Sequence, residues 1–98
     1  MSATGNKIIL VTGANTGIGW ETVKVLLQSS QSYHVLLGAR SLASGEEAIL
    51  ALKNDVPETT STTEVVEIDL ISDDSINSAF EKIKAAHGQI DILVNNAG

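Results

Sequence analysis

The chain has 98 residues, 43% of them hydrophobic and only 3% aromatic, which suits one small domain, or part of a larger one, with an aliphatic core. Its formal charge of -6 argues against a nucleic-acid surface, and the lack of cysteine excludes disulfides and thiolate metal sites. The first apolar run, 8–11, is too short for a signal peptide or a membrane span. We therefore expect a cytoplasmic protein that binds neither nucleic acid nor membrane.

The first predicted unit is a strand, a glycine turn and a helix. Residues 7–12 read KIILVT, a β-branched apolar run that is typical of a strand buried on both faces. After the turn, a helical pattern runs over about 18–29 and places Ile18, Thr22, Val25 and Leu26 on one face. Trp20 is expected to pack on the sheet rather than to stack on a ligand.

The next units continue this alternation. Residues 34–39 predict a second buried strand, and Ser41 is the expected cap of a helix over 42–54 whose core face holds Ala48, Ile49 and Leu52. A polar loop over 54–63 leads to a third strand at 64–69. Ser72 then caps a helix to about residue 87, ended by Gly88, with the core stripe Ile76, Ala79, Phe80 and Ile83. A fourth strand is expected at 90–95.

This β-α-β-α-β-α-β order predicts an α/β fold with a doubly wound parallel sheet. Right-handed crossovers give the strand order 3-2-1-4. A complete fold of this type continues with two more strands beside the fourth, so residues 1–98 are expected to be a partial domain, truncated after the fourth strand. The fourth strand would then be an apolar edge, which favours self-association.

The turn after the first strand is the first candidate site. It reads TGANTGIG over residues 12–19, between a predicted strand and a predicted helix. A helix N-terminus offers free N–H groups to a pyrophosphate, and glycines let the backbone approach it closely. The alternative is a glycine turn that serves only the packing of helix on strand.

Two further motifs stand at the carboxyl ends of predicted strands. Asp69-Leu70 closes the third strand, and Asn95-Asn96-Ala97-Gly98 closes the fourth. Together with the glycine turn, which matches the pattern TGxxxGxG, they resemble the short-chain dehydrogenase/reductase family of classical type, and its carbonyl-reductase-like branch in particular. The resemblance covers residues 7–98 and implies the N-terminal half of an NAD(P)-binding Rossmann fold.

The resemblance also implies roles for single residues. In the turn, Gly13, Gly17 and Gly19 would shape the pyrophosphate cradle, Asn15 and Thr16 would lie at the adenosine ribose and phosphates, and the Ile18 N–H would lie near the pyrophosphate. Asp69 would accept a hydrogen bond from the adenine amino group, beside Leu70. Asn95, Ala97 and Gly98 would line the ribose, and Thr12 would tie the first strand to the fourth. Without the family, Asp69 is equally well explained as a turn former, and the asparagines as hydrogen-bonding groups at the sheet end.

The end of the second strand favours NADP over NAD. Folds specific for NAD place an acidic residue about 20 positions past the glycine turn, on the ribose 2′-hydroxyl. That position is Ala39, and the next residue, Arg40, can bind a 2′-phosphate with its guanidinium fork. The alternative is an arginine that merely ends the strand.

Catalytic and metal-binding residues are not expected in the chain. The family uses a Ser and a Tyr-x-x-x-Lys pair downstream of NNAG, whereas the one tyrosine, Tyr33, is followed four residues later by Leu37. His34 and His87 are interpreted as structural, since no imidazole–carboxylate cluster has metal-ligand spacing. The whole protein would thus reduce a carbonyl or oxidise an alcohol by hydride transfer, and this part would bind the cofactor. A non-catalytic nucleotide-binding module remains an alternative, and a methyltransferase is a weaker one.

Overall fold

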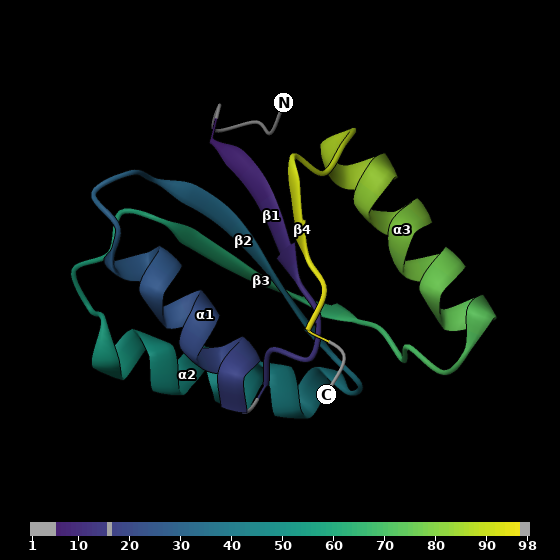
Figure 1. Ribbon diagram of the computed structural model, residues 1–98, viewed down its shortest axis with the longest axis horizontal. Coiled ribbons are helices and arrows are strands. Elements are labelled where there is room, and N and C mark those ends of the chain that lie inside the picture. The colour runs from purple at the N-terminus through teal and green to yellow at the C-terminus, as the bar shows by residue number, and fades with distance from the viewer. Residues whose placement is uncertain (1–5, 16, 97–98) are drawn as a thin grey trace.

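The computed structural model describes residues 6–15 and 17–96, which form one parallel four-stranded sheet with helices on both faces (Figure 1). The strands are β1 (Lys7–Val11), β2 (Tyr33–Ala39), β3 (Thr62–Glu67) and β4 (Ile92–Val94). Their order is β3-β2-β1-β4, and every neighbouring pair is parallel. The predicted α/β class, strand order and parallel sheet are therefore confirmed.

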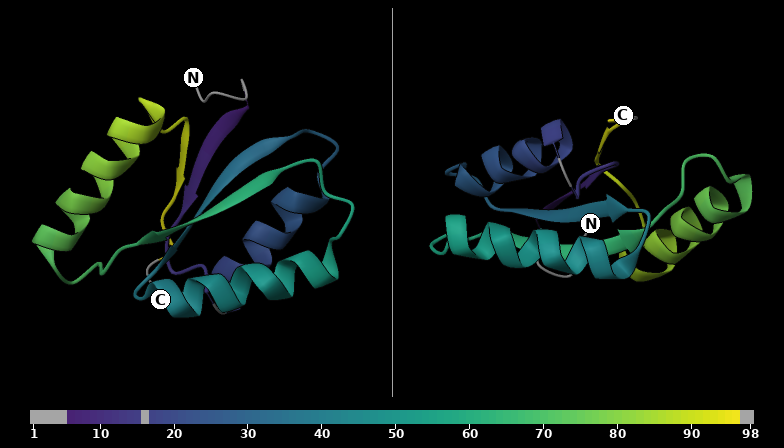
Figure 2. Two further views of the ribbon diagram at one scale, coloured as in Figure 1. Left: turned by 180° about the vertical axis from the view of Figure 1, so that it is seen from behind. Right: turned by 90° about the horizontal axis from the view of Figure 1, so that it is seen from below.

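The three helices cover opposite faces of this sheet. Helices α1 (Gly17–Gln28) and α2 (Leu42–Asp55) lie on one face, and α3 (Asp73–His87) lies on the other (Figures 1 and 2). Side chains alternate along β1 because successive residues of a strand point to opposite faces. Ile9 and Val11 pack toward α1 and α2, whereas Ile8 and Leu10 pack toward α3. The central strands are thus apolar on both faces, as their sequences predict.

The buried face of α1 differs from the face that the sequence suggests. The structure buries Gly19, Val23 and Leu27, while Ile18 is 76% exposed and Val25 is 63% exposed. A Cβ at position 19 would collide with the carbonyl oxygen of Gly13. The rotation of α1 is therefore set by the close contact of a glycine with the turn, which hydrophobic periodicity does not report.

Trp20 packs beside this buried face, as expected. Its ring borders the core formed by the sheet, α1 and α2. The indole Nε1–H donates a hydrogen bond of 3.2 Å to the carbonyl oxygen of Ala48, which joins α1 to α2. This contact gives the residue a structural role in helix packing.

The ends of the helices follow the capping signals in the sequence. The Ser41 hydroxyl accepts a hydrogen bond from the Ser44 N–H, and the Ser72 hydroxyl accepts one from the Ser75 N–H, each of 3.2 Å. Gly88 ends α3 with a φ of 84°, a left-handed value that favours glycine. None of the helices in the described part of the chain has the length and apolar character needed to cross a membrane.

The last two strands have bounds that differ from those predicted. β3 starts at Thr62, because Thr62 and Thr63 continue the pairing with β2 opposite His34 and Val35. β4 covers only Ile92–Val94. Just before β4, the Asp91 carboxylate accepts the N–H of Ile8 at 2.8 Å and so takes the place of a backbone acceptor. β3 is thus extended by pairing of its polar start with β2, and β4 is preceded by a side-chain contact in place of a backbone one.

Candidate functional site

A cleft of about 510 Å³ lies at the carboxyl ends of the strands, where ligands bind in open parallel sheets. It is bordered by the glycine turn after β1, the end of β2, the segment after β3 and the segment after β4. Its lining residues are Gly13, Asn15, Gly17, Ile18, Ala39, Arg40, Ile68, Asp69, Leu70, Ile71 and Asn96. Four separate segments of the chain thus meet at one site.

The glycine turn has the backbone shape that a close ligand contact requires. Gly13 and Gly17 have φ values of 60° and 64°, in the left-handed region. A Cβ on Gly17 would meet nothing within 4 Å, so the space beside this residue at the start of α1 is open. The Ala14 N–H donates to the Gly38 carbonyl oxygen at 2.9 Å, which holds the turn against β2. The turn is therefore anchored and leaves room over the helix N-terminus.

Thr12 joins the end of β1 to the segment after β4. Its backbone N–H donates to the Val94 carbonyl oxygen at 3.1 Å. Its hydroxyl donates to Asn95 Oδ1 at 3.2 Å and accepts the Asn96 N–H at 3.0 Å. Asn96 in turn donates its side-chain amide to the Gly13 carbonyl oxygen at 3.3 Å. The role assigned to Thr12 by resemblance, a tie between the first and fourth strands, agrees with these contacts.

Arg40 is the cation that borders the cleft. It follows the last residue of β2, Ala39, which is 1% exposed, and its own side chain is exposed. Within the described residues, no carboxylate forms an ion pair with Arg40. Its guanidinium is thus available to an anion that enters the cleft.

Asp69 and Leu70 form the wall opposite the glycine turn. The Asp69 N–H donates to the Ser75 hydroxyl at 2.8 Å, which fixes the segment to α3, and Asp69 Oδ1 accepts the Ile71 N–H at 3.1 Å. The carboxylate therefore does act as a turn former, as the alternative interpretation states. Leu70 is 37% exposed at the cleft and offers an apolar surface beside that carboxylate.

The structure brings most of the predicted site residues together. Seven of them line the cleft: Gly13, Asn15, Gly17, Ile18, Arg40, Asp69 and Leu70. Gly19 lies behind the lining, against Gly13, and Asn95 is hydrogen-bonded to Thr12 outside it. Thr16, Ala97 and Gly98 fall outside the described residues.

Four lining residues were not among the predicted site residues: Ala39, Ile68, Ile71 and Asn96. Asn96 belongs to the NNAG motif, so its position carried a signal. Ile68 and Ile71 flank the Asp69-Leu70 pair and carried only the general signal of a strand end.

Comparison with known proteins identifies the family of this chain. A family model described as short chain dehydrogenase matches residues 7–98, which include all four segments around the cleft. The chain belongs to the short-chain dehydrogenase family. A relative from the fungus Talaromyces stipitatus, the short-chain dehydrogenase/reductase tropE, is 45% identical over all 98 residues. The chain spans 37% of the length of that relative.

Solved structures of two reductases or oxidoreductases share the fold. An L-sorbose reductase from Gluconobacter frateurii, complexed with NADPH and L-sorbose, matches 95% of this chain and 34% of its own with a TM-score of 0.78 and 28% identity. A metagenomic short-chain oxidoreductase in complex with NADP matches 94% of this chain and 39% of its own, with a TM-score of 0.75 and 33% identity. The family and the Rossmann-type fold are thus supported independently.

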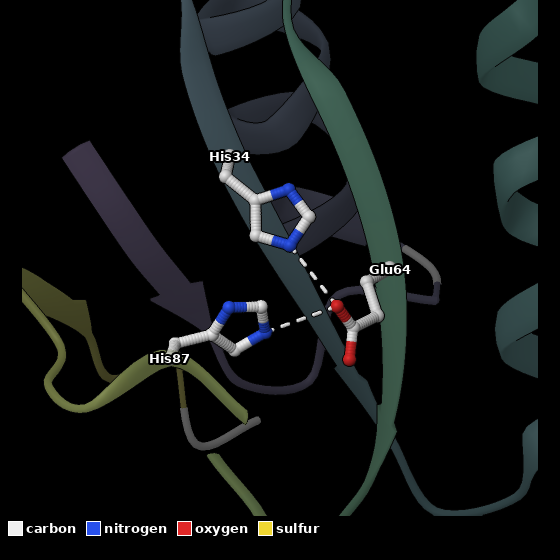
Figure 3. Close-up of side chains that lie close together, drawn as sticks. All are labelled: His34, Glu64 and His87. Atoms are coloured by element: carbon white, nitrogen blue, oxygen red, sulfur yellow. Dashed lines mark hydrogen bonds and ion pairs between the residues drawn. The ribbon is translucent and has the colours of Figure 1, made fainter. Parts of the chain in front are cut away.

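A second group of side chains lies at the other end of the sheet. His34, Glu64 and His87 converge there, each with one potential metal-ligand atom within 4.8 Å of the others (Figure 3). The sequence shows no imidazole–carboxylate cluster with metal-ligand spacing, but the structure brings these three residues together from separate elements. Spacing along the sequence does not reveal this cluster, because Glu64 is 30 residues from His34 and 23 from His87.

Proposed function

We propose that this chain is the NADP(H)-binding part of a short-chain dehydrogenase that transfers hydride between the cofactor and a carbonyl or alcohol carbon. The observation that carries the proposal is Arg40, an arginine at the rim of the glycine-turn cleft with no carboxylate partner among the described residues. A cation held ready at this place suits the 2′-phosphate that distinguishes NADP from NAD.

The other residues of the cleft fit the rest of such a cofactor. The open space beside Gly17 at the start of α1 would receive the pyrophosphate, where free N–H groups and the helix dipole favour negative charge. Asp69 has a second oxygen, Oδ2, for the adenine amino group, and Leu70 and Ile71 would contact the ring. When bound, the nicotinamide supplies the hydride, and this chain's residues position the cofactor.

Two further observations support the preference for NADP. Ala39 occupies the position where an acidic residue would accept the ribose 2′-hydroxyl of NAD and repel a 2′-phosphate. Two solved structures that share the fold of this chain are complexes with NADPH or NADP. We infer that Arg40, rather than Ala39, discriminates between the two cofactors.

The same proposal assigns binding without turnover to the 98 residues alone. Tyr33 lies at the amino end of β2, away from the cleft, and its hydroxyl donates to Gln31 Oε1 at 2.9 Å. Leu37, four residues on, is fully buried. Neither residue is placed to exchange a proton with a substrate in the cleft. A non-catalytic nucleotide-binding module is the second candidate, and it shares this binding site.

Calorimetric titration with two fragments of the cofactor tests the binding. Adenosine 2′,5′-bisphosphate carries the 2′-phosphate, whereas 5′-AMP lacks it. We expect the bisphosphate to bind at least about tenfold more tightly, because a charge-assisted hydrogen bond contributes about 1.5–3 kcal/mol. Equal affinity for both fragments would refute the NADP assignment, and no binding of either would refute the site.

A turnover assay separates the two candidates. NADPH oxidation is measured with a panel of ketones and ketoses, for the 98-residue chain and for a longer chain of the length of the curated relatives. Turnover only by the longer chain supports the oxidoreductase. Turnover by the 98 residues that is lost in Gly17→Trp would overturn the assignment of binding without catalysis.

A further inference from the structure

Two imidazoles and one carboxylate meet on the face of the sheet that α3 covers. His34 is on β2, Glu64 is on β3, and His87 is the last residue of α3. His34 Nε2 lies 3.0 Å from Glu64 Oε1, and His87 Nε2 lies 3.1 Å from the same oxygen (Figure 3). The two rings are 4.9 Å apart and inclined at 49°, so they are not stacked on each other. Three elements thus direct their donor atoms to one point.

The donor set is that of a zinc site. Two imidazoles and one glutamate are the protein ligands in several zinc enzymes, with bonds of about 2.0–2.2 Å. Tetrahedral geometry at that bond length separates neighbouring donor atoms by about 3.3 Å. The separations of 3.0 Å and 3.1 Å between each imidazole nitrogen and the glutamate oxygen are close to this value. All three donor atoms lie within 4.8 Å of one another, so a small rearrangement of the side chains would bring them around one ion.

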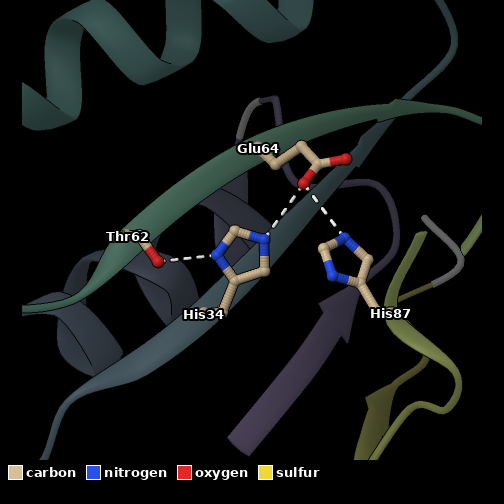
Figure 4. Close-up of polar contacts among 4 residues, drawn as sticks. All are labelled: His34, Thr62, Glu64 and His87. Carbon is tan, nitrogen blue, oxygen red and sulfur yellow. Dashed lines mark hydrogen bonds and ion pairs between the residues drawn. The ribbon is translucent and has the colours of Figure 1, made fainter. Parts of the chain in front are cut away.

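The surroundings of His34 support the same assignment. Its other ring nitrogen, Nδ1, lies 2.6 Å from the Thr62 hydroxyl (Figure 4). Without an ion, Nε2–H donates to the Glu64 carboxylate. With the ion bound, an Nδ1–H that donates to Thr62 would leave the Nε2 lone pair for the metal. Hydrogen bonds of this kind orient metal-ligating histidines in known sites. Thr62 lies opposite His34 in the β2–β3 register, so the sheet itself fixes this contact.

The exposure of the three side chains suits a metal that also binds water. The histidine side chains are 14% exposed, and Glu64 is 45% exposed. Solvent therefore reaches the cluster through Glu64, which leaves room for a fourth ligand. No residue in the described part of the chain other than these three belongs to the cluster.

We propose that His34, Glu64 and His87 bind a zinc ion that fastens the end of α3 to β2 and β3. The site lies at the amino ends of the strands, opposite the cofactor cleft, so its role is structural. It is independent of the proposed function, because none of its residues lines that cleft. If zinc binds the folded state and not the unfolded state, it raises the free energy of unfolding.

The test uses protein without a histidine tag, freed of metal, and titrated with Zn²⁺ in a calorimeter. We expect one site with a Kd of about 10 µM or below, as three protein ligands hold the ion. His34→Gln and His87→Gln should each weaken binding at least about tenfold, and Thr62→Val should weaken it about tenfold through the second ligand shell. Glu67→Gln, on the same strand, is the matched control and should leave the Kd unchanged. Mg²⁺, which prefers oxygen ligands, should not bind.

Nitrogen-15 chemical shifts of the imidazoles provide a readout that does not depend on variants. On addition of Zn²⁺, the Nε2 resonances of both histidines should move, and Nδ1 of His34 should carry the proton of that ring. The proposal is overturned if no heat appears up to about 1 mM Zn²⁺, a Kd range that corresponds to weak, nonspecific binding. It is also overturned if the double variant His34→Gln/His87→Gln binds zinc as tightly as the original chain, or if the ion shifts other nitrogens instead. Circular dichroism of each variant confirms that it is folded.

Discussion

The hydroxyl oxygen of Thr12 accepts the backbone N–H of Asn96 at 3.0 Å, across 84 residues of sequence. Thr12 is only 3% exposed, and the same hydroxyl donates to the Asn95 side chain. The contact holds the segment after β4 against the glycine turn, where Asn96 also bonds the Gly13 carbonyl oxygen. One buried hydroxyl therefore connects the sheet end to the glycine-turn cleft.

Replacing this hydroxyl should weaken both stability and binding. Thr12→Val leaves the Asn96 N–H without its acceptor, and we expect a loss of about 1–3 kcal/mol in the free energy of unfolding. NADPH affinity should fall as well, because Asn96 lines the cleft. Urea denaturation and calorimetry measure the two effects. Thr12→Ser, which keeps the hydroxyl, should retain most of the stability, and a Ser variant as unstable as the Val variant would contradict the role of the hydrogen bond.

Two glycines with positive φ separate strain from ligand contact. Gly17 and Gly88 both have left-handed φ values, 64° and 84°, and a Cβ on either would meet nothing within 4 Å. Alanine at each position should therefore destabilise the fold, by at least about 1–2 kcal/mol. Only Gly17 lines the cleft. We expect Gly17→Ala to lower NADPH affinity at temperatures where both variants are folded, and Gly88→Ala to leave it unchanged. Equal losses of affinity would show that strain alone is responsible.

Arg40 should determine the choice between NADP and NAD. Removing a charge-assisted contact to the 2′-phosphate is expected to weaken NADP binding by about 10- to 150-fold in Arg40→Ala. NAD carries no phosphate there and should lose little. Lys53→Ala, an exposed cation of α2 outside the cleft, is the control for a change in net charge. Titrations with both cofactors check this prediction, and an unchanged NADP/NAD affinity ratio in Arg40→Ala would exclude this residue as the selector.

Sequence patterns predicted the sheet because a strand buried on both faces is recognisable from its local run of apolar residues. The runs of β1 and β2 are apolar on both faces, and the alternation of strands with helices restricts the topology to a right-handed parallel order. The rotation of α1 was not predictable in the same way. It depends on the contact between Gly19 and the Gly13 carbonyl oxygen, which no hydrophobic periodicity encodes.

The two candidate sites differ in how far the sequence revealed them. The glycine-turn cleft is built from strand ends, so motifs at those ends predicted that Gly13, Gly17, Arg40 and Asp69 lie together there. The second cluster depends on strand register. Because His34 lies opposite Thr62, Glu64 falls two residues further along on the same face, within reach of a long side chain. That register cannot be predicted from the sequence pattern. The separations of Glu64 from the two histidines, 30 and 23 residues, match no local metal-binding motif.

The exposed edge of β4 predicts self-association of the 98-residue chain. Among the described strands, β4 pairs only with β1, and its side chains Ile92 and Leu93 are 42% and 50% exposed. An apolar strand with free N–H and carbonyl groups is a template for pairing with a second copy.

Leu93→Lys should shift the chain toward monomer in sedimentation velocity, because a charged side chain on an edge disfavours pairing. Leu50→Lys, at a position of α2 that is 62% exposed, should have a smaller effect, since it adds the same charge away from any strand edge. If both variants reduced association equally, net charge rather than the edge of β4 would control it, and a monomer at all concentrations before substitution would contradict the prediction outright.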